Sequence, residues 1–382
     1  MIITKLRLKN WKNFKAVEIP LSDTTYIIGP NSAGKSNLLD VFRFLRDVAK
    51  QEGGGLQKAV SDRGGLSKLR CLHARSDPRI AIDVELVSPA GVRWRYLLEF
   101  GSEGKGAQRL FVAKEEVYKE DICLLKRPDS DDRRDQTRLI QTHLEQILAN
   151  ENFRPLSEFL AETTYLHLVP QLLKFNQQIG GKVLEDDPFG QGFLERVART
   201  QSRNRDSKLA KIERVLKIAV PQFERLEFEK DEFTGRPHLR VRFAHFRPNA
   251  GWQREDQFSD GTLRLLALLW SLFDGDSLLL LEEPELSLNS AIVMEIPAMM
   301  QKIQRTTKRR RQIIISTHSE ALLSNQGINA LGVLVINPGE NGSTVRGITE
   351  AEQDAILNGF SVAEVVLPSS HTPAARQLSL AL

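Results

Sequence analysis

Alternating and continuous apolar runs divide the chain into short strands and amphipathic helices. Alternation over residues 2–9 and 15–20 predicts two strands that pair antiparallel near the start of the chain. A short apolar run at 26–28 predicts a buried strand, and apolar residues then recur at helical spacing over 38–48. The chain therefore begins with a small antiparallel sheet beside a strand that leads into a helix.

Two later runs are aliphatic without alternation. Residues 277–283 read Ser-Leu-Leu-Leu-Leu-Glu-Glu, and residues 312–318 read Gln-Ile-Ile-Ile-Ser-Thr-His. A strand buried on both faces is continuously aliphatic, and polar residues appear where it emerges at its carboxyl end. The pattern thus predicts parallel strands with Glu282, Glu283 and His318 at one edge of a sheet.

The rest of the pattern is mixed. Two alternating runs at 79–87 and 92–100 predict a hairpin, and the charged stretch 126–138 predicts a loop. From about 136 to 220 the spacing is mainly helical, with a basic flank on an amphipathic helix near its end. We expect an N-terminal half of a catalytic head over 1–120, an inserted, mainly helical lobe over 121–240 and a C-terminal half over 241–382.

The stretch Gly-Pro-Asn-Ser-Ala-Gly-Lys-Ser at 29–36 lies between the predicted strand and helix. A glycine-rich loop with Lys-Ser in this context is typical of a phosphate-binding loop. Its backbone N–H groups would converge on the β-phosphate of ATP, Lys35 would reach the β- and γ-phosphates, and Ser36 would bind Mg²⁺. The nucleotide-binding residues expected here are Asn31, Ser32, Ala33, Gly34, Lys35, Ser36 and Asn37.

The two glutamates after the leucines complete this chemistry. Glu282 would hold the Mg²⁺ shell together with Ser36, and Glu283 would orient or deprotonate the attacking water. ATP and Mg²⁺ are therefore the expected cofactors. The Gly-rich segment 51–69 suits a nucleotide-sensing loop and contains Gln57, but the spacing does not assign Gln57 that role.

Four stretches occur in a fixed order: GPNSAGKS, FSDGTLRLLALLW, LLLLEEPELSLN and QIIISTHS. In this order they resemble the Walker A, signature, Walker B with D-loop, and switch histidine of the RecF-like and SMC-like AAA family. The opening ITKLRLKNWKNF resembles the first strand of that family. The resemblance covers about residues 1–50 and 255–370 and implies an α/β fold, an ABC-type P-loop ATPase head with a mixed sheet and an inserted lobe.

The resemblance also implies roles for the signature and the histidine. Ser259 and Gly261 would face the γ-phosphate bound by a second subunit, so that two chains close over two ATP molecules, and His318 would lie beside the γ-phosphate. The chain departs from the family pattern in three places. Asp260 stands inside the signature, Glu282 replaces an aspartate, and Leu-Asn-Ser at 288–290 replaces Leu-His-Pro.

Composition and net charge limit the compartment and the partners that we expect for this protein. The net charge is +4 and the pI is about 9.0, which permits nucleic-acid binding without establishing it. We expect neither a membrane span nor a secretory signal, since no run of eighteen apolar residues and no charged-then-apolar leader occurs. Cys71 and Cys123 form no disulfide framework, which favours a cytoplasmic protein.

These inferences favour a homodimeric, ATP-driven switch. Among stand-alone relatives of this size, the resemblance implies bacterial anti-phage defence with a separate effector encoded nearby. The tail after His318 has no Asp-X-Asp pair for a fused nuclease. One alternative is a DNA-repair clamp of the same chemistry. Another is the nucleotide-binding subunit of a transporter, which the long insertion and the N-terminal opening disfavour.

Overall fold

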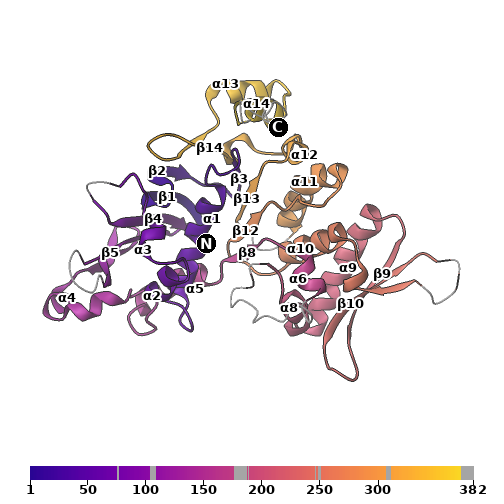
Figure 1. The fold of residues 1–382 in the computed structure, drawn as a ribbon, viewed down its shortest axis with the longest axis horizontal. Coiled ribbons are helices and arrows are strands. Elements are labelled where there is room, and N and C mark those ends of the chain that lie inside the picture. Colours follow the sequence, from indigo (N-terminus) through magenta and orange to yellow (C-terminus); the bar gives the residue numbers. More distant parts are fainter. Residues whose placement is uncertain are drawn as a thin grey trace, which may run out of the picture.

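The computed structural model describes residues 1–74, 77–103, 109–175, 187, 189–245, 247, 251–306 and 311–370. Its strands form two six-stranded sheets and one three-stranded sheet. In Figure 1 the first sheet lies on the left, the central sheet in the middle, and the part containing α9 and β10 on the right. No helix within these ranges is long and apolar enough to cross a membrane.

The first sheet is antiparallel throughout, in the order β2-β1-β4-β5-β6-β7. Its strands are β1 (Ile2–Trp11), β2 (Phe14–Pro20), β4 (Ile80–Val87), β5 (Arg93–Ser102), β6 (Leu110–Lys119) and β7 (Ile122–Arg127). The two predicted N-terminal strands and the predicted hairpin are present as β1–β2 and β4–β5.

The central sheet has the order β15-β14-β3-β13-β12-β8. Its strands are β3 (Thr24–Ile28), β8 (Thr164–Leu166), β12 (Leu279–Glu282), β13 (Ile313–Thr317), β14 (Val333–Asn337) and β15 (Thr344–Gly347). All neighbours are parallel except β14 and β15, so the sheet is mixed. The carboxyl ends of β3, β13, β12 and β8 therefore meet at one edge.

The alternation of side chains sorts this sheet into two cores. Ile27, Leu280 and Ile314 pack with helix α1 (Lys35–Ala49) and the first sheet. Leu281 and Ile315 pack on the opposite face with α10 (Asp260–Phe273) and α11 (Ser290–Thr306). Each central strand is buried on both faces, which explains the continuous aliphatic runs.

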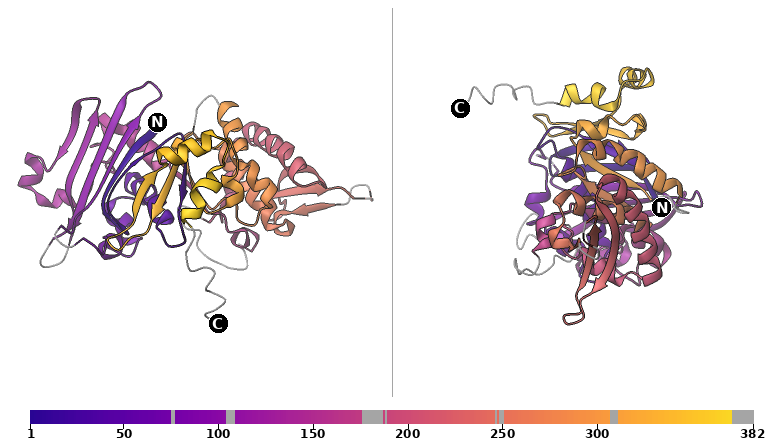
Figure 2. Two further views of the ribbon diagram at one scale, coloured as in Figure 1. Left: turned by 90° about the horizontal axis from the view of Figure 1, so that it is seen from above. Right: turned by 90° about the vertical axis from the view of Figure 1, so that its right-hand side faces the viewer.

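The remaining part holds α8 (Phe193–Arg199), α9 (Ser202–Ala219) and a sheet in the order β11-β10-β9. Its strands are β9 (Phe223–Lys230), β10 (Pro237–Phe243) and β11 (Trp252–Arg254). Figures 1 and 2 show the β9–β10 hairpin projecting from the end of the molecule farthest from the first sheet. The range 121–240 also supplies β7 to the first sheet and β8 to the central sheet. The boundaries of the predicted lobe therefore stay a prediction.

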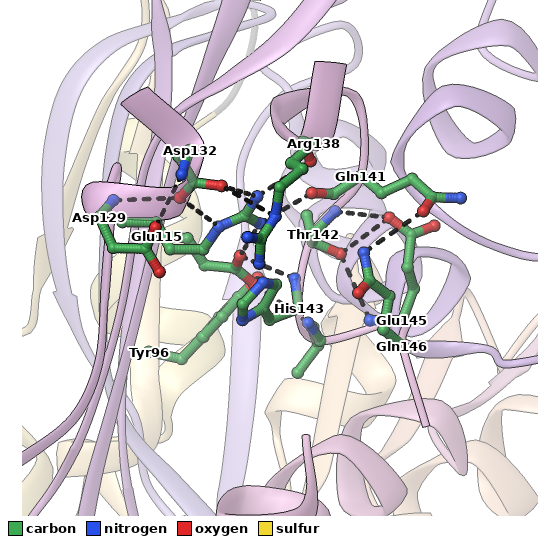
Figure 3. A network of polar contacts seen from close by, with 12 residues as sticks. Tyr96, Glu115, Asp129, Asp132, Arg138, Gln141, Thr142, His143, Glu145 and Gln146 are labelled. Carbon is green, nitrogen blue, oxygen red and sulfur yellow. Dashed lines mark hydrogen bonds and ion pairs between the residues drawn. The ribbon is translucent and has the colours of Figure 1, made fainter. Parts of the chain in front are cut away.

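Shorter elements connect these parts. They are α2 (Leu56–Ser61), α3 (Leu66–Leu69), α4 (Ser130–Arg134), η1 (Gln136–Ile140), η2 (Glu151–Phe153), α5 (Arg154–Ala161), α6 (Pro170–Lys174), η3 (Glu255–Gln257), α12 (Glu320–Leu323), η4 (Ala330–Gly332), α13 (Glu350–Leu357) and α14 (Val362–Ser370). The prediction of a loop over 126–138 was wrong, since α4 and η1 lie there. Arg127 in this segment is buried against Glu115 and Asp132. Figure 3 labels these two carboxylates.

Candidate nucleotide-binding site

The loop between β3 and α1 has the backbone of a phosphate-binding loop. Ser32 and Gly34 adopt left-handed φ angles of 65° and 113°. A Cβ atom added at Gly34 would lie 2.0 Å from Nδ2 of Asn13, so only glycine fits there. Helix α1 begins at Lys35, immediately after the loop, and its first N–H groups are directed toward the carboxyl edge of the sheet.

Asn13, in the turn between β1 and β2, braces this loop. Its Nδ2 donates to the carbonyl of Ala33 and to Oγ of Ser343, both at 2.8 Å, and its Oδ1 accepts from Asn37 at 2.8 Å. Ser343 donates in turn to the same Ala33 carbonyl at 2.7 Å. The loop is thus fixed by Asn13 and Ser343 from two distant segments and by Asn37 in the first turn of α1, a brace that the sequence did not predict.

Lys35 is buried beneath the loop. Its Nζ donates to the carbonyls of Gly29 at 2.9 Å and Pro30 at 3.3 Å. Burial lowers the pKa of the ammonium, while the carboxylates of Glu283, Glu282 and Glu285 raise it. The cation therefore rests on neutral carbonyl groups beside an anionic edge, where a phosphate would supply a direct counter-charge.

Glu282 lies at the end of β12 on the face that packs with α1. Its Oε1 accepts a hydrogen bond from Oγ of Ser36, and its Oε2 accepts one from the hydroxyl of Tyr165. Nδ1 of His167 lies 3.3 Å from the Glu282 carbonyl. The structure therefore brings together the two predicted metal ligands. A hydroxyl beside a carboxylate is an oxygen set that suits Mg²⁺.

Tyr165 and His167 are neighbours of this site that the sequence analysis missed. Tyr165 lies in β8, and His167 is the first residue after it. The strand has three residues and no evident motif. Burial and the adjacent Glu282 carboxylate raise the pKa of Tyr165 far above its usual value, so its hydroxyl stays a donor. The parallel pairing of β8 with β12 was the missing information.

Glu283 and His318 meet at the ends of β12 and β13. Nδ1 of His318 lies 3.0 Å from Oε1 of Glu283, with side-chain exposures of 50% and 25%. Glu283 has φ 45° and donates its N–H to the carbonyl of Ser316 at 3.0 Å. The left-handed turn at Glu283 directs the chain away from the sheet immediately after the carboxylate pair.

The signature residues lie at the start of α10. Ser259 is its N-cap, with Oγ accepting from the N–H of Thr262 at 3.1 Å. Asp260 accepts from Gln171 and Lys174, both at 2.7 Å, which ties α10 to α6. A Cβ added at Gly261 would lie 2.6 Å from the Ser287 carbonyl, so this glycine permits close packing against the segment after Walker B.

Gln57 lies away from this edge. It is part of α2, and its Nε2 donates to the carbonyls of Leu110 at 3.1 Å and Ile140 at 2.7 Å. These contacts join α2 to β6 and η1. They give Gln57 a packing role in the described structure.

Comparisons with known proteins agree with this geometry. A family model described as "AAA domain, putative AbiEii toxin, Type IV TA system" matches residues 25–324, and one described as "P-loop containing region of AAA domain" matches 3–45. The DNA replication and repair protein RecF of Chlamydia caviae is 50% identical over 46 residues, which is 12% of each chain. Structural maintenance of chromosomes protein 1 of Arabidopsis thaliana is 40% identical over 57 residues, 14% of this chain and 5% of that protein.

Solved structures share the fold over almost the whole chain. An Smc head bound to the C-winged helix domain of ScpA matches with a TM-score of 0.57 and 15% identity, covering 92% of this chain and all of that one. An Smc head with an extended coiled coil, in a complex derived from Pyrococcus furiosus, gives 0.51 and 14%, covering 94% and 98%. The predicted ABC-type head fold is therefore confirmed.

Proposed function

The chain belongs to this AAA-domain family, within its RecF-like and SMC-like members, and on this premise we propose that it is an ATPase acting as a dimeric switch. One observation supports the proposal above the others. Lys35, the Ser36–Glu282 pair and the Glu283–His318 pair converge at the carboxyl edge of four parallel strands. Ligands bind at this edge in open α/β sheets.

The phosphates would occupy the loop between β3 and α1. Backbone N–H groups of residues 31–35 would hold the β-phosphate, and Asn37 would follow in the first turn of α1. Lys35 would exchange its carbonyl partners for β- and γ-phosphate oxygens. Ser36 and Glu282 would hold Mg²⁺, which stabilises negative charge on the phosphates when bound.

Glu283 would orient and deprotonate the attacking water. Its carboxylate lies beside His318 and next to the predicted metal ligand Glu282, and one-quarter of its side chain is exposed. The hydrogen bond from Nδ1 of His318 would fix the direction of the Glu283 carboxylate. We therefore propose that Glu283 and His318 act on the attacking water rather than on the adenine ring of the nucleotide.

The signature would act across a dimer. The N–H groups at the start of α10, together with Ser259 and Gly261, would face the γ-phosphate held by a second copy. In their own chain these residues contact α6 and the segment after Walker B. ATP would thus join two copies, and hydrolysis would release them.

The first test measures ATP affinity and turnover in two variants. Lys35→Ala should lose productive binding, because it removes the cation that meets the ground-state phosphates. Glu283→Gln should bind ATP with turnover reduced by about 10²–10⁴-fold, the usual contribution of a positioned base. Glu320→Gln is the matched control, since Glu320 is an exposed glutamate at the start of α12. Normal turnover by Glu283→Gln would remove the base assignment.

A second test addresses the dimer. Mixed dimers of Lys35→Ala with Ser259→Arg have one doubly damaged site and one intact site, so about half of the wild-type sites survive if the sites act independently. A tandem-linked dimer with a single lesion separates loss of shared geometry from strict coupling of the two sites. Full activity in a monomeric Ser259→Arg protein would contradict the switch.

The cellular role we propose is anti-phage defence with a separate effector. The matching family is described as a putative toxin of a toxin–antitoxin system, which supports a defence role. Co-purification with the product of an adjacent gene, dependent on ATP and on Glu283→Gln, tests it. The RecF match favours a DNA-repair ATPase as the alternative. ATP-dependent DNA binding that weakens steeply with salt would support that alternative.

A further inference from the structure

The turn after β12 contains a third glutamate, Glu285, that the proposed reaction does not use. Glu285 is 7% exposed. Its Oε1 accepts hydrogen bonds from Oγ1 of Thr317 at 2.5 Å and from the N–H of His318 at 3.4 Å. Its Oε2 is buried and has no hydrogen-bond partner in the described chain. A buried carboxyl group is costly, so its place beside β13 calls for an explanation.

Glu285 is connected, directly or through Thr317, to three consecutive residues at the carboxyl end of β13. Ile313 and Ile315 pack on the α10 and α11 face of the sheet, and the alternation of the strand puts Thr317 on that same face. The N–H of Ser319 donates to Oγ1 of Thr317 at 3.0 Å. One carboxyl group therefore fixes residues 317–319, directly or through Thr317.

The residue in the middle of this segment is His318. Its imidazole lies on the other side of the turn, with Nδ1 at 3.0 Å from Glu283. Glu283 and Glu285 thus hold the histidine at both ends, one through the ring and one through the backbone. Burial raises the pKa of Glu285 even though Thr317 donates to its carboxyl group.

We propose that Glu285 is a positioning residue for His318. By fixing residues 317–319 it sets the imidazole against Glu283. An apolar side chain would fill the same space without the cost of burying a carboxyl group, but it could not accept hydrogen bonds from Thr317 and His318. The inference rests on the proposed function, in which Glu283 and His318 act on the attacking water.

The first measurement follows the histidine itself in the full-length protein. Imidazole nitrogens are labelled with ¹⁵N, and the His318 signals are identified by their loss in His318→Gln. Glu285→Ala and Thr317→Val should both shift the His318 signals, whereas Glu320→Ala should leave them in place. Glu285→Gln, which keeps an oxygen acceptor, should restore signals close to wild type. Unchanged His318 signals in both Glu285→Ala and Thr317→Val would overturn the proposal.

The second measurement is a double-mutant cycle on turnover. Glu285→Ala should lower kcat by about tenfold to a hundredfold, the cost of a misplaced catalytic group, with KM for ATP within about twofold. In the His318→Gln background the same change should cause little further loss, because residues acting as a unit are not additive. An equal loss in both backgrounds would contradict action through His318.

The two measurements separate this inference from the proposed function. If the wild-type protein does not hydrolyse ATP, the proposed function fails, and the histidine spectra still decide whether Glu285 sets the imidazole. If Glu285→Ala does not fold, Thr317→Val tests the same contact. It removes one hydroxyl donor and retains the shape of the side chain.

Discussion

The nucleotide site and the cluster around Arg127 contain the same kinds of side chain, a cation, two acids and a histidine. In the Arg127 cluster every charge is met within the chain. Arg127 pairs with Asp132 at 2.9 Å and Glu115 at 3.1 Å, and all three side chains are completely buried. Glu115 also accepts from the N–H groups of His143 and Leu144, at 2.8 and 3.1 Å. Figure 3 labels Glu115 and His143 in this cluster.

In the nucleotide site, the described residues do not pair every charged side chain in this way. Lys35 donates to two neutral carbonyls, Glu282 accepts from two hydroxyls, and the side chain of Glu283 contacts a half-exposed histidine. The two clusters differ in whether charged groups of the same chain pair with their side chains. Around Arg127 each charged group has oppositely charged partners in the chain, and the cluster stabilises the fold. Around Lys35 and Glu282 the partners are neutral groups, and the cluster suits a charged ligand.

The largest expected effect is on folding. Arg127→Met should lower the free energy of unfolding by about 3–5 kcal/mol, because it leaves two buried carboxylates without their cation. Arg93→Met, in an exposed pair with Glu120, should cost less than about 1 kcal/mol. Urea unfolding of both variants measures the contrast. Equal losses would remove the distinction between closed and exposed ion pairs.

Lys35→Met should leave folding nearly unchanged and abolish the stabilisation that ATP gives. Removal of a cation that rests on neutral carbonyls should change the free energy of unfolding without nucleotide by less than about 1 kcal/mol. A hundredfold loss of ATP affinity removes about 2.7 kcal/mol of binding free energy. Thermal unfolding with and without Mg-ATP shows both effects. A Lys35→Met protein as unstable as Arg127→Met would break the comparison.

The Arg127 cluster should also weaken in acid. Burial, together with the nearby Arg127 cation, lowers the pKa of His143 to about 4. The unfolded chain binds this proton near pH 6.5, so between pH 7 and 4 it binds more protons than the folded chain, and stability falls as the pH falls. We expect a loss of about 2 kcal/mol, discounted because the ring is only partly buried. His143→Gln should remove this part of the pH dependence of urea unfolding.

The smallest effect separates capping from catalysis at Ser259. Ser259→Ala should cost about 1 kcal/mol of stability by removal of the α10 cap. Ser259→Asp keeps a cap and should retain stability, but it should lower ATP turnover, because a carboxylate would face the phosphate of the partner. Urea unfolding and turnover are measured on the same samples. Full turnover in Ser259→Asp would leave Ser259 with a capping role alone.

The sequence predicted the parts whose signal is local. The four leucines before Glu282 and the isoleucines before His318 indicate doubly buried strands, and GPNSAGKS indicates the phosphate loop without help from distant residues. The charged stretch 126–138 was misjudged because its partner Glu115 lies on another strand, so a buried ion pair has the composition of a solvated loop. Tyr165 and Glu285 were missed for the same reason. Their roles come from the pairing of β8 with β12 and of residue 285 with Thr317.

The Asn13 brace has a consequence for the order of events during synthesis. The phosphate loop emerges from the ribosome early, but Ser343, which holds its Ala33 carbonyl, follows more than three hundred residues later. Gln312 likewise bonds both the N–H and the carbonyl of Ile3. A nascent chain that ends before β15 therefore contains the loop and Asn13 but lacks the part of the brace that Ser343 supplies. We therefore expect the growing chain to bind nucleotide only late in synthesis, after the segments near residues 312 and 343 have paired with the N-terminal segment.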